Sequence, residues 1–189
     1  MKQLNPLYTQ EETLQQIKES FASSTPNILH LPHFLTMQIY ESLLKQCASA
    51  KEVHKKVADR YSYTELKEIP ASMLQSAEFI SWLSSITGRK IKKISYTLKK
   101  FSHCDYTLLH DSETIGERLE FFILLMPNWD SRWGGHTVYV AEEQSPILFP
   151  LEGNSFNLIN KEKNRHKFIQ YINHYAKKEK MVIIEGIAE

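Results

Sequence analysis

The chain has 189 residues, of which 42% are hydrophobic and 24% are charged, and its formal net charge is +1 at pH 7. This composition is typical of a globular domain and excludes a disordered, highly charged chain. A net charge so close to zero gives no reason to expect nucleic acid or an anionic membrane as a partner.

The N-terminal segment lacks the apolar core of a signal peptide, and no stretch approaches the roughly 20 apolar residues of a membrane-spanning helix. Cys47 and Cys104 are isolated in the sequence and are expected to be reduced thiols. We therefore expect a soluble, cytoplasmic protein. The sequence carries no signal for its oligomeric state.

In the first half of the chain, apolar residues recur every three or four positions in three segments, which predicts three amphipathic helices. The first covers residues 12–22, the second begins at Met37, and the third ends at Gly88, where glycine suits a helix cap. Residues 27–34 predict a short strand. The charged stretch 51–70 predicts irregular structure.

After Gly88 the apolar pattern becomes short and alternating, and turn residues separate the segments. Strands are expected at residues 91–101, 105–110, 119–126, 136–140, 147–149, 156–159, 167–172 and 181–187. Eight short strands without intervening helices predict a sandwich or jelly roll. We expect one α+β domain over residues 1–189, with 1–88 as mainly helical support and 89–189 as the β core.

The stretch DYTLLHDSETIGERLEFFILLMPNWDSRWGGH, residues 105–136, resembles the central block of the prolyl 4-hydroxylase-like Fe(II)/2-oxoglutarate oxygenases. The likeness is strongest to the ribosomal-protein prolyl hydroxylases. PNILHLPHFLT and SAEFISWLSSITG are similar to the family's entry strand and a later helix, and GNSFNLINKEKNRHKFIQY to the block with its distal histidine. The resemblance implies a double-stranded β-helix, a jelly roll or cupin-like barrel, with N-terminal supporting helices.

The resemblance also implies iron ligands at His110 and His166. Because the central block matches without a gap, the family's aspartate ligand falls on Ser112. Alternation along a strand places residues 110 and 112 on one face, so Asp111 is a substitute ligand only if the strand ends in a turn there. Two histidines and a carboxylate hold Fe(II) and leave open positions for 2-oxoglutarate and O₂.

Four further residues are assigned to the pocket by this resemblance. Lys180 is expected to pair with the distal carboxylate of 2-oxoglutarate, and Tyr106, on the strand face of His110, to donate its hydroxyl to it. Trp129 and His136 are expected at the mouth of the substrate pocket.

The implied function is an Fe(II)- and 2-oxoglutarate-dependent dioxygenase that hydroxylates a peptidyl or small-molecule substrate. Ser112 leaves two alternatives open. Chloride in the vacated ligand position would give a halogenase-like enzyme, and loss of the metal would leave a binding module. The substrate itself is set by pocket loops, which the sequence does not resolve.

Overall fold

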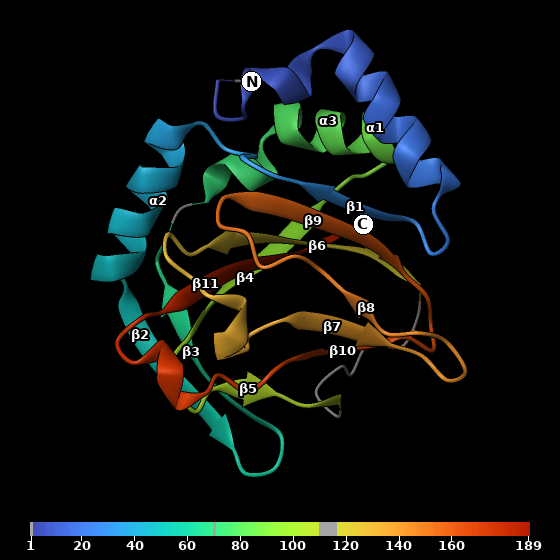
Figure 1. The fold of residues 1–189 in the computed structure, drawn as a ribbon. Helices are drawn as coiled ribbons and strands as arrows, with labels where there is room; N and C mark the ends of the chain where they lie inside the picture. The colour runs from blue at the N-terminus through green and yellow to red at the C-terminus, as the bar shows by residue number, and fades with distance from the viewer. Residues whose placement is uncertain (1, 70, 110–116) are drawn as a thin grey trace.

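The computed structural model describes residues 2–69, 71–109 and 117–189 (Figure 1). Its strands form one antiparallel sheet in the order β1-β9-β6-β11-β4-β3-β5-β10-β7-β8, with β2 paired to β3. The strands are β1 (Ile28–Leu31), β2 (Lys51–Val57), β3 (Tyr61–Lys67), β4 (Ile94–Phe101), β5 (Tyr106–Thr107), β6 (Arg118–Leu125), β7 (Thr137–Val140), β8 (Ile147–Leu148), β9 (Ser155–Lys161), β10 (His166–Ile169) and β11 (Met181–Ala188).

The sheet curls into two facing layers, one of β1-β9-β6-β11-β4 and one of β5-β10-β7-β8, which β3 joins (Figure 1). This is the jelly-roll arrangement of a double-stranded β-helix, so the predicted fold is confirmed. The eight strands predicted after Gly88 are all present. The strand predicted at 105–110 is shorter, because the described strand covers only Tyr106–Thr107.

Three helices support the sheet: α1 (Glu11–Ser23), α2 (Met37–Ser49) and α3 (Ala77–Thr87), as predicted. Four short 3-10 helices complete the described structure: η1 (Pro6–Thr9), η2 (Ser72–Gln75), η4 (Ser131–Trp133) and η5 (His174–Ala176). The side chain of Ser76 begins α3 by accepting a hydrogen bond from the amide of Phe79. The helix ends at Gly88, whose φ of +67° is the left-handed conformation that glycine adopts without strain.

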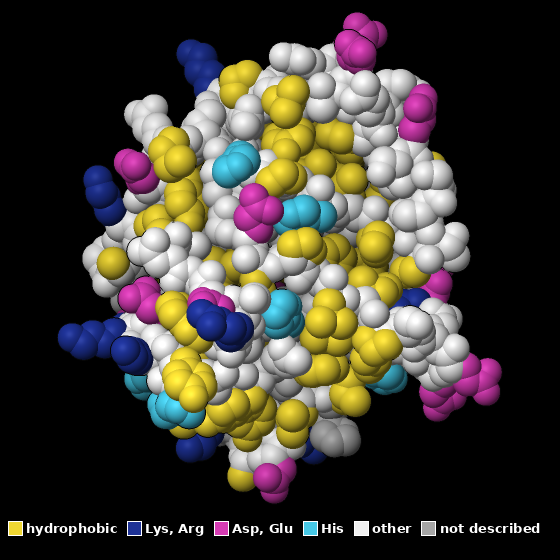
Figure 2. Space-filling model, in the orientation of Figure 1, with side chains coloured by type: hydrophobic (Ala, Val, Ile, Leu, Met, Phe, Trp, Pro, Cys, Tyr) yellow, Lys and Arg dark blue, Asp and Glu magenta, His cyan; other side chains and the backbone are white. Residues whose placement is uncertain are grey.

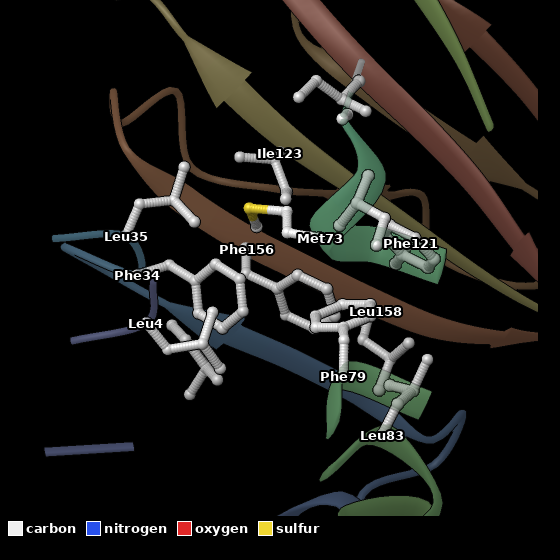
Figure 3. Packing of buried hydrophobic residues seen from close by; sticks show 14 of the residues in the cluster. Leu4, Phe34, Leu35, Met73, Phe79, Leu83, Phe121, Ile123, Phe156 and Leu158 are labelled. Atoms are coloured by element: carbon white, nitrogen blue, oxygen red, sulfur yellow. The ribbon is translucent and has the colours of Figure 1, made fainter. Parts of the chain in front are cut away.

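The helices pack on the outer face of the first layer, and a cluster of aromatic rings fills the space between them (Figures 1 and 3). The ring of Phe156 stacks on Phe34 at 4.6 Å and on Phe121 at 5.4 Å between centroids. Phe79 from α3 meets the same rings edge to face. We call this cluster the outer core.

The prediction of irregular structure for residues 51–70 was wrong, because β2 and β3 form a hairpin there. Most side chains of β2 are exposed, which explains the low hydrophobicity of this stretch. In β3, Thr64 and Leu66 are buried, and the strand pairs with both β4 and β5. The hairpin therefore belongs with the barrel, although it lies in the part of the sequence expected to be mainly helical.

Candidate functional site

The space between the two layers is apolar toward the end where β6 finishes and β11 begins, which we call the apolar end. Alternate residues of each strand face this interior, as the pleat of a strand requires. The buried apolar side chains of the interior, most of them toward this end, are Phe101, Phe122, Leu124, Met126, Tyr139, Phe149, Ile159, Ile169, Ile172, Ala176, Met181 and Ile183.

Toward the opposite end, where β6 begins and β9 finishes, the interior contains ionised side chains. We call this the charged end, and its hydrogen-bonded residues the interior network: Lys99, Arg118, Glu120, Tyr139, Lys167 and Glu185. Two carboxylates from neighbouring strands lie at its centre. Glu120 is buried, the side chain of Glu185 is 12% exposed, and each has at least two cations around it.

The carboxylate of Glu185 lies 2.8 Å from the ammonium of Lys99 and 3.3 Å from that of Lys167. Burial by itself raises the pKa of Glu185, but these two lysines outweigh burial and hold the pKa at about 2. Glu185 is therefore ionised at neutral pH. Lys99 also lies 4.9 Å from the ring centre of Tyr63, within range of a cation–π contact.

Glu120 accepts hydrogen bonds from the side chain of Arg118 at 2.5 Å and from the Tyr139 hydroxyl at 3.0 Å, and lies 3.5 Å from Lys167. Burial opposes ionisation of Glu120, yet Lys167 and Arg118 lower its pKa below the usual value. Burial and the nearby Glu120 charge raise the pKa of Tyr139, so its hydroxyl remains a donor. Lys167 links the two carboxylates and joins the layers of the barrel.

Of the predicted iron ligands, the structure describes His166 alone; His110, Ser112 and Asp111 lie outside the described residues. His166 pairs with Val140 at the start of β10 and is exposed. The inward positions of β10 are taken by Lys167, which joins the interior network, and Ile169. Because neighbouring strand residues face opposite sides, the imidazole of His166 faces away from the interior.

The residues assigned to 2-oxoglutarate are also apart from the charged end. The ring of Tyr106 lies 6.4 Å from that of Tyr171, which is half exposed. Lys180 is exposed just before β11 begins, at the apolar end. The described positions of these two residues do not bring them to a common point with His166.

The residues assigned to the substrate pocket, Trp129 and His136, lie at the apolar end. The indole of Trp129 donates to the carbonyl of Gly134 at 3.0 Å and meets the ring of Trp133 at 5.4 Å. His136 is partly buried, and its Nδ1 has no hydrogen-bond partner in the described structure. His136 therefore lies at the opposite end of the β7–β10 pair from His166.

Beside Trp129, the short helices η4 and η5 enclose a surface cavity of about 520 Å³, which we call the η4–η5 pocket. Figure 2 shows charged and hydrophobic side chains close together over these two helices, at the lower left of the view. The pocket is lined by Asp130, Arg132, Trp133, Tyr175 and Lys177.

Two features tie the η4–η5 pocket together. Asn173 donates to the carbonyl of Arg132 at 2.7 Å, which joins the two helices. Gly134 has a φ of +86°, and a Cβ there would lie 2.1 Å from the carbonyl oxygen of Tyr171. Only glycine fits this close approach.

Sequence reasoning did not identify the interior network. A signal was present, since Glu120 interrupts the apolar run RLEFFILL and Glu185 the run MVIIEGIA. A charged residue within a strand that is otherwise buried predicts a buried partner of opposite charge. The positions of those partners follow from strand pairing, which the sequence did not provide.

Of the candidate iron ligands, only His166 belongs to the described residues. Within residues 2–69, 71–109 and 117–189, no group of three or more His, Cys, Asp and Glu side chains is placed to hold a metal ion. His166 faces outward, and the family's aspartate position is a serine in the sequence. In the same residues, no helix is long and apolar enough to cross a membrane.

Comparison with known proteins places the fold in a family. The family model described as "Oxoglutarate and iron-dependent oxygenase degradation C-term" matches residues 50–187. The prolyl 3-hydroxylase OGFOD1 of Mus musculus is 29% identical over 151 residues, which cover 67% of this chain and 28% of that protein. Its counterpart in Xenopus laevis is 32% identical over 92 residues, covering 45% of this chain and 18% of that protein.

Solved structures with low sequence identity share the fold. A 2OG-Fe(II) oxygenase-family oxidoreductase from Burkholderia pseudomallei has a TM-score of 0.70 at 9% identity, covering 95% of this chain and 92% of that one. A prolyl hydroxylase from Trichoplax adhaerens, solved with a hypoxia-inducible-factor peptide, has a TM-score of 0.67 at 12% identity, covering 96% and 94%. The chain spans about a quarter of the length of the mouse relative, and it belongs to the family of iron- and oxoglutarate-dependent oxygenase C-terminal domains.

Proposed function

We propose that this chain serves in prolyl hydroxylation by an Fe(II)- and 2-oxoglutarate-dependent oxygenase, with a proline-containing peptide or protein as the substrate. The family match over residues 50–187 carries this proposal, because it spans every strand of the barrel except β1. Both curated relatives named above are prolyl 3-hydroxylases. Because these relatives are hydroxylases, they do not favour the halogenase-like alternative with chloride.

Within such an oxygenase, we assign this barrel a binding role. In a typical site of this class, two histidines and a carboxylate face the interior and leave positions open for cosubstrate. Here Lys167 takes the inward position beside His166, and the interior network occupies the charged end.

The η4–η5 pocket is the best candidate for the substrate site. Trp133 and Tyr175 give it two aromatic side chains, and proline-rich segments dock on aromatic-lined grooves. Arg132 is already paired with Asp130 at 2.5 Å, so Lys177 is the cation in the pocket that remains for an acidic substrate group. The expected ligand is an extended peptide with proline and a nearby acidic residue.

The decisive experiment is anaerobic titration with Fe(II) and 2-oxoglutarate, followed by visible absorption and metal analysis. We expect no charge-transfer band and no stoichiometric iron, in wild type and in Ser112→Asp alike, because His166 faces away from the interior. A band that His110→Ala abolishes would instead assign the iron site to this barrel.

A second measurement tests the binding role. Fluorescence anisotropy of a labelled proline-containing acidic peptide is expected to report binding that Trp133→Ala weakens about tenfold, the effect of losing one aromatic contact of roughly 1.4 kcal/mol. Trp82→Phe, buried in the outer core, is the matched aromatic control and should leave the affinity unchanged. Equal binding by wild type and Trp133→Ala would contradict this pocket.

A further inference from the structure

Two buried cations at the charged end are not accounted for by the interior network. Lys161 ends β9, and Arg165 precedes β10 across a tight turn; each is 1% exposed. Side chains of this kind are almost never fully buried unless a partner neutralises them. The hydrogen bonds and charges around these two side chains therefore show how far each is neutralised by the described residues.

The hydrogen-bonding groups of Arg165 are incompletely used. One nitrogen of Arg165, Nη2, bonds to the side chains of Gln144 and Glu162. Its Nε and Nη1 are buried and have no partner within the described structure. The buried Lys161 lies near the charges of Glu120, Arg118, Lys167 and Arg165. Buried donors without acceptors carry the full cost of their lost hydration.

The charges around these donors do not balance. Four cations gather around this point: Lys161 itself, Arg118, Arg165 and Lys167. Against them stand the buried Glu120, Glu185 with a side chain 12% exposed, and the half-exposed Glu162 beside Arg165. The described residues thus leave an excess of positive charge in a site of low solvent access.

Electrostatics at Lys161 point the same way. Burial lowers the pKa of Lys161; Glu120 opposes this, while the nearby charges of Arg118, Lys167 and Arg165 add to it. A small anion would relieve the desolvation and the repulsion together, and would accept hydrogen bonds from the unpartnered donors.

We propose that the charged end binds a small oxyanion, a phosphate or carboxylate group, held by the ammonium of Lys161 and by Nε and Nη1 of Arg165. The site differs from the predicted 2-oxoglutarate anchors, since Lys180 lies at the apolar end. It requires no metal, and it stands whether or not the proposed prolyl-hydroxylase role is correct.

The test is binding and thermal unfolding with inorganic phosphate at constant ionic strength, on wild type, Lys161→Met and Arg165→Met. Phosphate is expected to raise the melting temperature of wild type in a saturable way, because it binds the folded state alone. Lys161→Met keeps the length of the side chain and removes the charge. It should melt higher than wild type without phosphate and bind phosphate at least about tenfold more weakly, the loss of one charge-assisted hydrogen bond.

Lys178→Met is the matched control, because Lys178 is exposed in the turn before β11 at the apolar end. It should respond to phosphate as wild type does. Equal phosphate responses of wild type and Lys161→Met would overturn the proposal. Calorimetry with phosphate, succinate and 2-oxoglutarate distinguishes the sources: binding of phosphate or succinate supports a general oxyanion site, and binding of 2-oxoglutarate alone contradicts it.

Discussion

The first layer of the barrel has two faces that are stabilised in different ways. On its outer face, the outer core joins the sheet to the helices through rings such as Phe156 and Phe79 (Figure 3). On its inner face, at the charged end, Glu120 and Glu185 join the layers through ion pairs. Both faces are buried, and both come from alternate residues of the same strands.

The difference shows what each face requires of a sequence. Apolar burial has no direction, so the outer core demands mainly volume and shape. A buried ion pair gains little over apolar packing, but removal of one member leaves a charge without a partner. The outer core should therefore tolerate conservative changes, whereas the interior network should depend on each of its members.

The largest effect is expected from Phe156→Ala. This ring is fully buried and contacts rings from α3, from β6 and from the segment between β1 and α2, so its loss opens a cavity that neighbours cannot fill. We expect a loss of about 4 kcal/mol in the free energy of unfolding, measured in urea. Leu148→Ala, at a position 53% exposed, is the control and should change it by less than about 0.5 kcal/mol. Similar losses in unfolding free energy at both positions would contradict a special contribution of the outer core to stability.

The next effect is expected in the interior network, from Glu185→Ala. It leaves Lys99 and Lys167 near each other without this carboxylate, and should cost about 3 kcal/mol in unfolding free energy. The double variant Glu185→Leu with Lys99→Met should recover part of this loss, because it removes both charges. Additive effects of the two changes would show that the pair is not coupled.

Acid should weaken the inner face before the outer one. The pKa of Glu185 is about 2 in the folded protein against 4.5 as its ordinary value, so its stabilisation is fully present above about pH 4.5 and is lost as the pH falls toward 2. Its side chain is 12% exposed, and we expect a loss of roughly 2 to 3 kcal/mol over this range. Urea unfolding at several pH values measures it. Glu185→Gln should flatten the profile, and an unchanged acid slope would assign it to other groups.

Local patterns in the sequence predicted the fold well where one face of an element is buried. The helix at α3 follows from its apolar stripe and Gly88, and the strands at β6 and β11 follow from long apolar runs. The β2–β3 hairpin was missed because the side chains of β2 are largely exposed, so its strands carry no apolar alternation. Pairing of β3 with β4 holds the hairpin in the sheet, and this contact cannot be read from the local apolar pattern.

The candidate site was harder to predict than the fold. Motif matching assigns His166 to the block of the distal histidine, but it cannot decide which of two adjacent residues faces inward. That choice depends on register, and a shift of one residue exchanges His166 for Lys167. The interior network depends in turn on which strands become neighbours, which is a property of the closed barrel.

The smallest effect on stability is expected from the side chain that caps the start of α3, the helix that contributes Phe79 to the outer core. Ser76 caps α3, and its Oγ accepts a hydrogen bond from the amide of Phe79 at 3.2 Å. Ser76→Ala should lower the free energy of unfolding by about 1 kcal/mol, since one amide at the helix start loses its acceptor. Ser72→Ala, an exposed serine in η2, is the matched control and should have little effect. Because Phe79 belongs to the outer core, hydrogen exchange in Ser76→Ala should rise first in α3, while the interior network remains protected. Faster exchange in β11 and β6 as well would mean that the two faces unfold as one unit.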